Sequence, residues 1–307
     1  MAPTRTAPDR KTETSMTATQ SRPASSANDS FAFVQMLAGE LSSGKIDMPS
    51  FPDIAARVRK VLSDEFVSSK QVVKVVGTEP ALAGKLMMIA NSVAMNPNGA
   101  RITDLNTAIT RIGLNMVRSA SLAFAMEQIR KSEGFVSLRA PMNALWERSV
   151  LVAALSFVVA KRLTALNADT AMLAGLMHGM GKLYILTRAT KHPGLFKDMS
   201  VYNQIVRDWH SSIAKAILEN WEINDEIVSA VESFEDLDRD HKGASDLTDV
   251  LTVSNLLASF HDVPDSIELN IQGVKACTRI GLTKDVAMKV LKESAEEVAS
   301  LRAALGA

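Results

Sequence analysis

The stretch LWERSVLVAALSFVVAKRL, residues 145–163, decides the fold class of this chain. Its apolar residues occupy nearly every face of a helix, which is typical of a helix buried at the centre of a protein. The charge-free part runs only from Ser149 to Ala160, whereas a helix needs ~20 apolar residues to cross a bilayer. The stretch therefore predicts a central core helix and not a membrane span.

A second apolar stretch, AMLAGLMHGMG at residues 171–181, predicts another buried helix. Outward from these two, apolar residues recur every three or four positions, with helix signals between them. Ser68 and Gln71 form a capping-box pattern, Pro80 suits a first helical turn, and Gly113 is a stop signal. The last amphipathic helix is expected to run from Thr283 to Leu301.

No stretch of comparable length alternates apolar and polar residues as a strand does. The sequence therefore predicts an all-α protein of two packed helical bundles, separated by the charged segment Arg130–Pro141. The expected boundaries are a disordered tail at 1–30, an N-terminal helical subdomain at 31–135, a second helical subdomain at 136–265 and a C-terminal helical extension at 266–307.

Composition narrows the classes of partner. Lysine and arginine total 34, as do aspartate and glutamate, so the net charge is zero. A neutral chain has no general attraction to nucleic acid or to anionic membranes, and we expect neither as a partner. The single cysteine, Cys277, excludes an intrachain disulfide and fits a reducing, cytoplasmic compartment.

The common catalytic and phosphate-binding motifs are missing from the sequence. Gly181–Lys182 is not a phosphate-binding loop, because Leu183 stands where a serine or threonine would bind magnesium. The acidic segment Glu232–His241 lacks the spacing of a calcium-binding loop and is predicted to be a solvated charged loop. Cys277 has no neighbouring histidine, which favours a buried structural thiol.

Several motifs together resemble the HDOD domain, a bacterial, all-helical signalling module related to the HD phosphohydrolases. In chain order they are MPSFP (48–52), EPALAGKL (79–86), ANS (90–92), ITDL (102–105), LWERS (145–149), AGLMHGMGKL (174–183) and WH (209–210). The resemblance covers about residues 41–261. It implies an N-terminal HDOD subdomain followed by an HD-like one.

The resemblance also places the metal site of the catalytic HD proteins. Those proteins hold a divalent metal with a histidine, an adjacent His–Asp pair and a later aspartate. The matching positions are Arg148, then His178 with Gly179, then Asn255. Only His178 keeps a ligand, and Arg148 adds a fixed positive charge. We therefore expect no bound metal, no cofactor and no catalytic residue.

Lys182 and His210 complete the vestigial HD-site positions. His178 is predicted to be a buried structural residue, and His210 a half-buried, hydrogen-bonded one. Because Gly179 and Asn255 replace acidic groups beside two cations, the resemblance also allows a pocket for a small anion such as phosphate or a nucleotide. In the simpler interpretation, Arg148 pairs with an acidic residue or reaches solvent.

The resemblance implies a non-catalytic regulatory or adaptor protein of bacterial signal transduction, acting through contacts with protein partners. One alternative is a degenerate, metal-dependent HD phosphohydrolase with an unusual ligand set. Another is an anion or nucleotide sensor that uses the vestigial HD cavity.

Overall fold

The structure is a computed structural model that describes residues 24–44, 46, 53–64, 66–97, 99–131, 133–261, 263 and 266–306. The MPSFP motif and most of the predicted tail lie outside these residues. The first described element, helix α1, begins at Ala24, inside the segment expected to be a tail.

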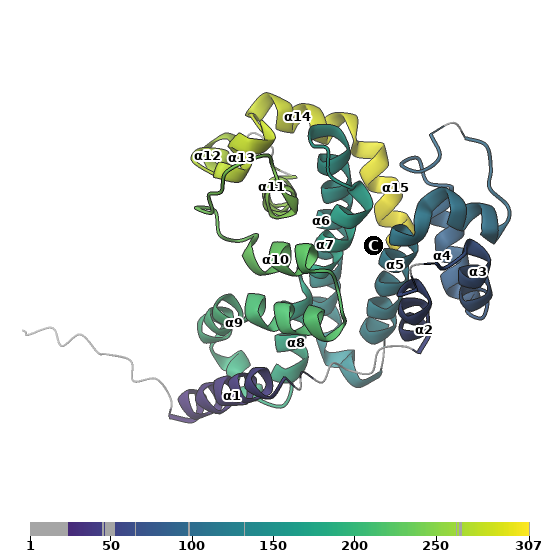
Figure 1. Cartoon of the computed structure of the whole chain (residues 1–307). Coiled ribbons are helices and arrows are strands. Elements are labelled where there is room, and N and C mark those ends of the chain that lie inside the picture. The colour runs from purple at the N-terminus through teal and green to yellow at the C-terminus, as the bar shows by residue number, and fades with distance from the viewer. Residues whose placement is uncertain are drawn as a thin grey trace, which may run out of the picture.

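The described chain is built from helices, and no strand occurs in it, which confirms the predicted all-α class (Figure 1). The elements are α1 (Ala24–Ser43), α2 (Asp53–Leu62), α3 (Ser69–Val76), α4 (Pro80–Ala90), α5 (Leu105–Lys131), η1 (Glu133–Leu138), α6 (Arg139–Leu163), α7 (Ala168–Met177), α8 (Met180–Ala189), η2 (Pro193–Lys197), α9 (Met199–Asn220), α10 (Asp225–Ser233), α11 (Leu247–Ser259), α12 (Ile267–Ile271), α13 (Lys275–Ile280), α14 (Lys284–Glu293) and α15 (Ala295–Leu305).

Local sequence signals set several of these boundaries. Ser68 and Gln71 form the predicted capping box at the start of α3, and Pro80 is the first residue of α4. Gly113 has φ +77° and interrupts α5 as a kink, because this left-handed backbone is available to glycine at little cost. These three predictions are confirmed.

The prediction of one unbroken helix from Thr283 to Leu301 is wrong. Thr283 does cap a helix, but α14 ends at Glu293 and α15 begins at Ala295. The buried Ser294 between them donates its hydroxyl to the carbonyl of Val290, 2.6 Å away. The break lets α15 change direction and pack on α6.

Helix α6 is the central helix, as the opening stretch predicts. It packs against α7, α11 and α15, and its residues from Val152 to Ala160 are all buried. Its closest neighbour is α7: a Cβ placed on Gly175 would lie 2.5 Å from the Cα of Ala153. Only glycine lets the two backbones approach this closely.

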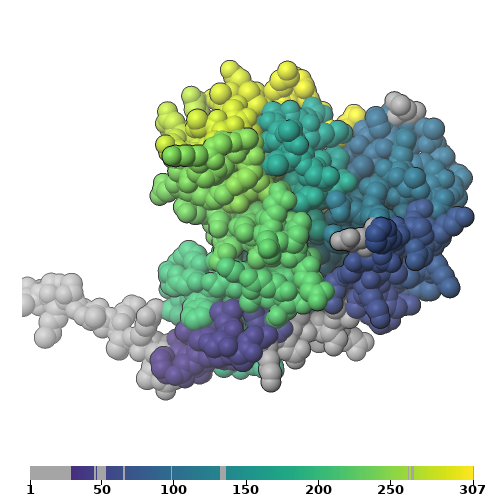
Figure 2. Space-filling model, in the orientation of Figure 1, coloured from purple at the N-terminus to yellow at the C-terminus, as the bar shows by residue number. Residues whose placement is uncertain are grey.

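Helices α2–α5 lie on one side of the view in Figure 2 and helices α8–α11 on the other, and α5 packs directly on α7. We refer to α2–α5 as the N-terminal group and to α6–α11 as the C-terminal group. Helix α15 bridges them, running between α6 and the pair α4 and α5 (Figure 1). On one side the ammonium of Lys85 donates to the carbonyl of Leu305 at 2.9 Å. On the other the indole of Trp146 donates to the carbonyl of Gly306 at 3.0 Å.

The span Val136–Leu163 is long and apolar enough to cross a membrane by length and composition alone. However, 67% of its most apolar window is buried inside the protein. That burial is typical of a core helix, which agrees with the interpretation of the sequence.

Candidate functional site

Arg148 and Asn255, the first and last positions of the vestigial site, bind each other directly. The Nη2 group of Arg148, on α6, lies 2.6 Å from the side-chain oxygen of Asn255 and 2.7 Å from its carbonyl. The hydroxyl of Ser259, one turn further along α11, lies 2.8 Å from the same nitrogen. A guanidinium therefore links two helices at the positions that the resemblance matches to HD metal ligands.

His178 caps the end of α7 and is buried. Its Nδ1 lies 2.6 Å from the carbonyl of Gly175, which can only accept, so Nδ1 carries the proton. The pKa of His178 is lowered to about 4, mainly because the ring is buried. The hydrogen bond to Gly175 raises the pKa by a smaller amount, and the charges of Lys182 and Arg148 lower it. At neutral pH the ring is uncharged, and it meets Phe234 edge-on.

Two glycines beside His178 are fixed by close packing. A Cβ on Gly179 would lie 2.7 Å from the hydroxyl of Ser149, and one on Gly181 would lie 1.8 Å from the carbonyl of His210. The first contact occupies the space that the aspartate of an HD pair would need. The second lets α8 lie directly against α9.

Glu235 joins Lys182 to His210. One carboxylate oxygen lies 2.7 Å from the ammonium of Lys182, and the other lies 2.9 Å from Nε2 of His210. Burial alone would raise the pKa of Glu235, but these two hydrogen bonds outweigh it and lower the pKa to about 2. His210 is buried, and its Nδ1 has no partner in the described part of the chain.

The structure thus brings the six predicted positions into one region. Arg148 contacts Asn255, and Lys182 is joined to His210 through Glu235. Phe234 lies between the imidazoles, with ring centroids 5.4 Å from His178 and 6.5 Å from His210. Gly179 packs on Ser149, the neighbour of Arg148.

The sequence interpretation missed the role of Glu235. The sequence places Glu235 in the acidic segment Glu232–His241, whereas in the structure its carboxylate binds Lys182 and His210. A buried histidine needs a polar partner, so the sequence could have indicated an acidic partner for His210. A charged carboxylate at this position also opposes the binding of an anion, and the anion-pocket hypothesis did not take it into account.

The donors at these positions do not fit a divalent metal. Arg148 has no lone pair to offer, Gly179 has no side chain, and the side-chain oxygen of Asn255 already accepts from Arg148. His178 and His210 remain, yet the described residues here contain no set of three histidine, cysteine or carboxylate ligands close enough to share an ion.

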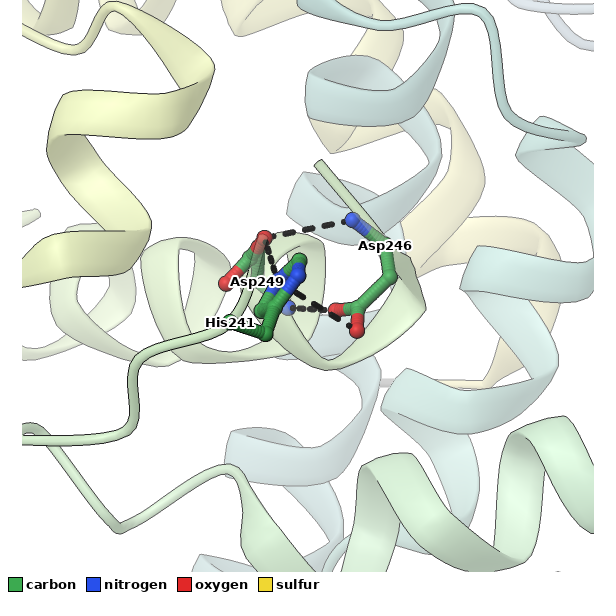
Figure 3. Close-up of side chains that lie close together, drawn as sticks. All are labelled: His241, Asp246 and Asp249. Carbon is green, nitrogen blue, oxygen red and sulfur yellow. Dashed lines mark hydrogen bonds and ion pairs between the residues drawn. The ribbon is translucent and has the colours of Figure 1, made fainter. Parts of the chain in front are cut away.

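The described residues do hold one such set elsewhere, made by His241, Asp246 and Asp249 (Figure 3). Nε2 of His241 lies 3.0 Å from Asp249, which is almost fully buried. However, Arg279 donates to both oxygens of Asp249 at 2.7 and 2.9 Å, and Arg239 pairs with Asp246 at 2.5 Å. Guanidinium groups already neutralise these carboxylates. The cluster ties the charged loop to α11 and α13, so the loop is less free in solvent than the sequence suggests.

Cys277 is buried and free. Burial, and then the nearby charge of Asp249, raise the pKa of its thiol to about 11. A thiol that stays protonated at neutral pH is not a nucleophile, in agreement with the predicted structural role.

The domain is all-helical, and the positions that the resemblance matches to HD metal ligands bring together no set of three ligands among the described residues. The model of the HDOD domain family matches residues 48–237. The match spans more than half of the chain, and the protein therefore belongs to the HDOD domain family.

Three solved structures show how widely the fold is shared. A candidate metal-dependent phosphohydrolase from Shewanella amazonensis SB2B is 26% identical, with a TM-score of 0.73 over 91% of this chain and 99% of that one. An HDOD domain protein of unknown function from Geobacter sulfurreducens is 20% identical, with a TM-score of 0.62 over 88% and 96%. A candidate signal transduction protein from Marinobacter aquaeolei VT8 is 18% identical, with a TM-score of 0.57 over 92% and 68%. Comparison with curated proteins gave no match.

Proposed function

We propose that the protein is a non-catalytic regulatory adaptor of bacterial signal transduction, acting in the cytoplasm through contacts with other proteins. The hydrogen bonds between Arg148 and Asn255 carry this proposal. They hold α6 and α11 together at two positions where an HD enzyme would use its metal, so the scaffold has a link of its own there.

The charges around this link support the same proposal. Arg148 and Lys182 are both cationic and both interact electrostatically with His178. A divalent cation would have to approach the fixed charge of Arg148, while the nearby carboxylate of Glu235 is already paired with Lys182. Family membership is consistent with signalling, and the name of the Marinobacter neighbour points to the same class.

The enzyme alternative rests on the Shewanella neighbour, whose name describes a candidate metal-dependent phosphohydrolase. Metal content and manganese-dependent hydrolysis of bis(p-nitrophenyl) phosphate separate the two functions. We expect a substoichiometric metal content and no hydrolysis above the blank. About one metal per chain, lost in His178→Ala but kept in His192→Ala, would overturn the proposal.

The adaptor role also needs a direct test. Tagged full-length protein, crosslinked in its native cells, should retain specific protein partners, and each should bind again as a purified protein. Because the proposed contacts need no metal, EDTA should leave these complexes intact. Failure of every captured protein to bind in purified form would overturn the adaptor role.

A further inference from the structure

One large cavity of the structure lies away from the vestigial site. It has a volume of about 830 Å³ and lies between α2 and α5 on one side and the turn from α9 to α10 on the other. Small-molecule sites usually have volumes of about 300–1,000 Å³. Its walls therefore come from both groups of helices.

Most of the wall is apolar. Val58 and Leu62 contribute from α2, Leu122 from α5 and Ile227 from α10, and all four side chains belong to the buried core. Trp221, at the end of α9, also lines the cavity. A wall of this kind suits an apolar ligand body, because contact with it removes apolar surface from water.

Arg118 supplies a positive charge and hydrogen-bond donors to the cavity wall. This half-buried side chain of α5 lines the cavity and donates one hydrogen bond, from Nη2 to the carbonyl of Leu62 at 3.2 Å. No carboxylate among the described residues lies within ion-pair distance of it. Burial lowers the pKa of Arg118, because its charge loses hydration.

A buried charge is costly unless it is paired. Arg118 keeps further N–H donors, and a guanidinium presents its donors in a fork that matches a carboxylate. The other charged residues of the described lining are the exposed Arg59 and Glu222. The lining thus carries a net charge of about +1, which favours a monoanion over a polyphosphate.

Glu222, which also lines the cavity, has an unusual backbone conformation. It has φ +52° and is the non-glycine residue with positive φ in the described chain. The N–H groups of Glu222 and Ile223 bond back to the carbonyls of Glu219 and Leu218, which is the Schellman ending that normally takes glycine at this position. A side chain kept on a strained backbone often marks a functional site.

We propose that this cavity binds a small amphiphilic carboxylate, with the carboxylate on Arg118 and the apolar body against Val58 and Leu62 of α2. Such a ligand would touch both groups of helices at once and so stabilise their relative position. This inference does not depend on the proposed adaptor function, because it concerns a different part of the molecule.

Two fluorescent probes test the site directly on the full-length protein. One is 1-anilinonaphthalene-8-sulfonate, a monoanion with an aromatic body, and the other is neutral N-phenyl-1-naphthylamine, which lacks the charge. We expect saturable binding of the anion with a stoichiometry of one. Arg118→Gln should weaken it about tenfold or more, the usual scale of a charged hydrogen bond, and change the neutral probe by less than about twofold.

Matched variants guard against general effects on folding. Arg111 lies on the same helix as Arg118, but its guanidinium donates to Asn96. The Arg111→Gln variant should therefore bind both probes as the wild type does. Ala56→Trp, at the exposed edge of the cavity, should block both probes. Circular dichroism melting of each variant confirms that it is folded.

Competition identifies the ligand class. Octanoate should displace the anionic probe, whereas octanol and inorganic phosphate should need about tenfold higher concentrations. Equal sensitivity to octanoate and octanol, or preferential displacement by phosphate, would overturn the assignment to a carboxylate. Absence of saturable binding, or binding that ignores both Arg118→Gln and Ala56→Trp, would overturn the site itself.

Discussion

Two contacts between helices are built in opposite ways. We call the contact between α6 and α7 the packed contact, and the contact between α2–α5 and the α9–α10 turn the open contact. In the first, Gly175 lets the backbone of α7 lie against the backbone of α6 around Ala153. In the second, the helices leave a cavity of about 830 Å³ with a half-buried arginine on its wall.

The difference between the two contacts shows that a contact built for stability and a contact able to bind a ligand need different packing. Close packing to crystal-like density stabilises the fold and leaves no room for a ligand. At the open contact the half-buried Arg118 has no carboxylate partner among the described residues, and this is the group that the proposed ligand would pair with. The vestigial HD site resembles the packed contact, since Arg148, Asn255 and Ser259 bind one another.

The largest expected effect tests the packed contact. Gly175→Ala forces a Cβ to within 2.5 Å of backbone on α6, and overpacking of this kind costs about 3 kcal/mol or more when backbone must move. Gly84→Ala, in α4 where nothing lies within 4 Å of the added Cβ, should instead stabilise the protein by about 0.5–1 kcal/mol. Urea unfolding measures both. A small loss in Gly175→Ala would show that α6 and α7 can separate easily.

The second prediction concerns the pH dependence of His178, which lies at the end of the packed contact. The folded-state pKa is lowered to about 4, so its contribution is fully present above the unfolded pKa near 6.5 and is lost as pH falls from there to about 4. At ~1.4 kcal/mol per pKa unit, the loss is about 3 kcal/mol.

The measurement is urea unfolding between pH 4 and 8 for the wild type, His178→Asn and His192→Asn. His178→Asn should lose less stability on acidification than the wild type, because it has no imidazole to protonate. His192→Asn should follow the wild type. Parallel curves for all three proteins would show that His178 is not buried in its neutral form.

The third prediction concerns the stability of the open contact in the ligand-free protein. Arg118→Met removes a half-buried, unpaired charge and keeps the apolar stem, so it should stabilise the free protein by up to about 1 kcal/mol. Arg111→Met, which loses the hydrogen bond to Asn96, should be neutral or slightly destabilised. Thermal melting at low phosphate and acetate concentrations makes the comparison. A clear loss of stability in Arg118→Met would mean that the bond to Leu62 already balances the charge.

The sequence predicts the packed contact far better than the open one. Periodicity, capping signals and the apolar stretch at 145–163 lead to the correct class and to a central α6, because they act over a few residues or one helix. The meeting of Arg148 with Asn255 could be anticipated only through family resemblance. The cavity could not be anticipated at all, since its walls come from α2, α5, α9 and α10, and space between distant segments leaves no local pattern.

The smallest expected effect concerns the strained turn at the open contact. A left-handed backbone costs a residue with a Cβ roughly 1–2 kcal/mol, whereas glycine adopts it freely but loses roughly 0.5–1 kcal/mol more chain entropy on folding. Glu222→Gly should therefore stabilise the protein by about 0.5–1 kcal/mol, while Glu219→Gly, inside α9, should destabilise it by a similar amount. The same Glu222→Gly change removes a negative charge from the cavity lining, so octanoate should bind more tightly and phosphate should become a better competitor. Urea unfolding together with probe displacement measures both effects. A destabilised Glu222→Gly would mean that the glutamate side chain holds the turn through contacts of its own, and strain at this residue would then no longer distinguish the open contact from the packed one.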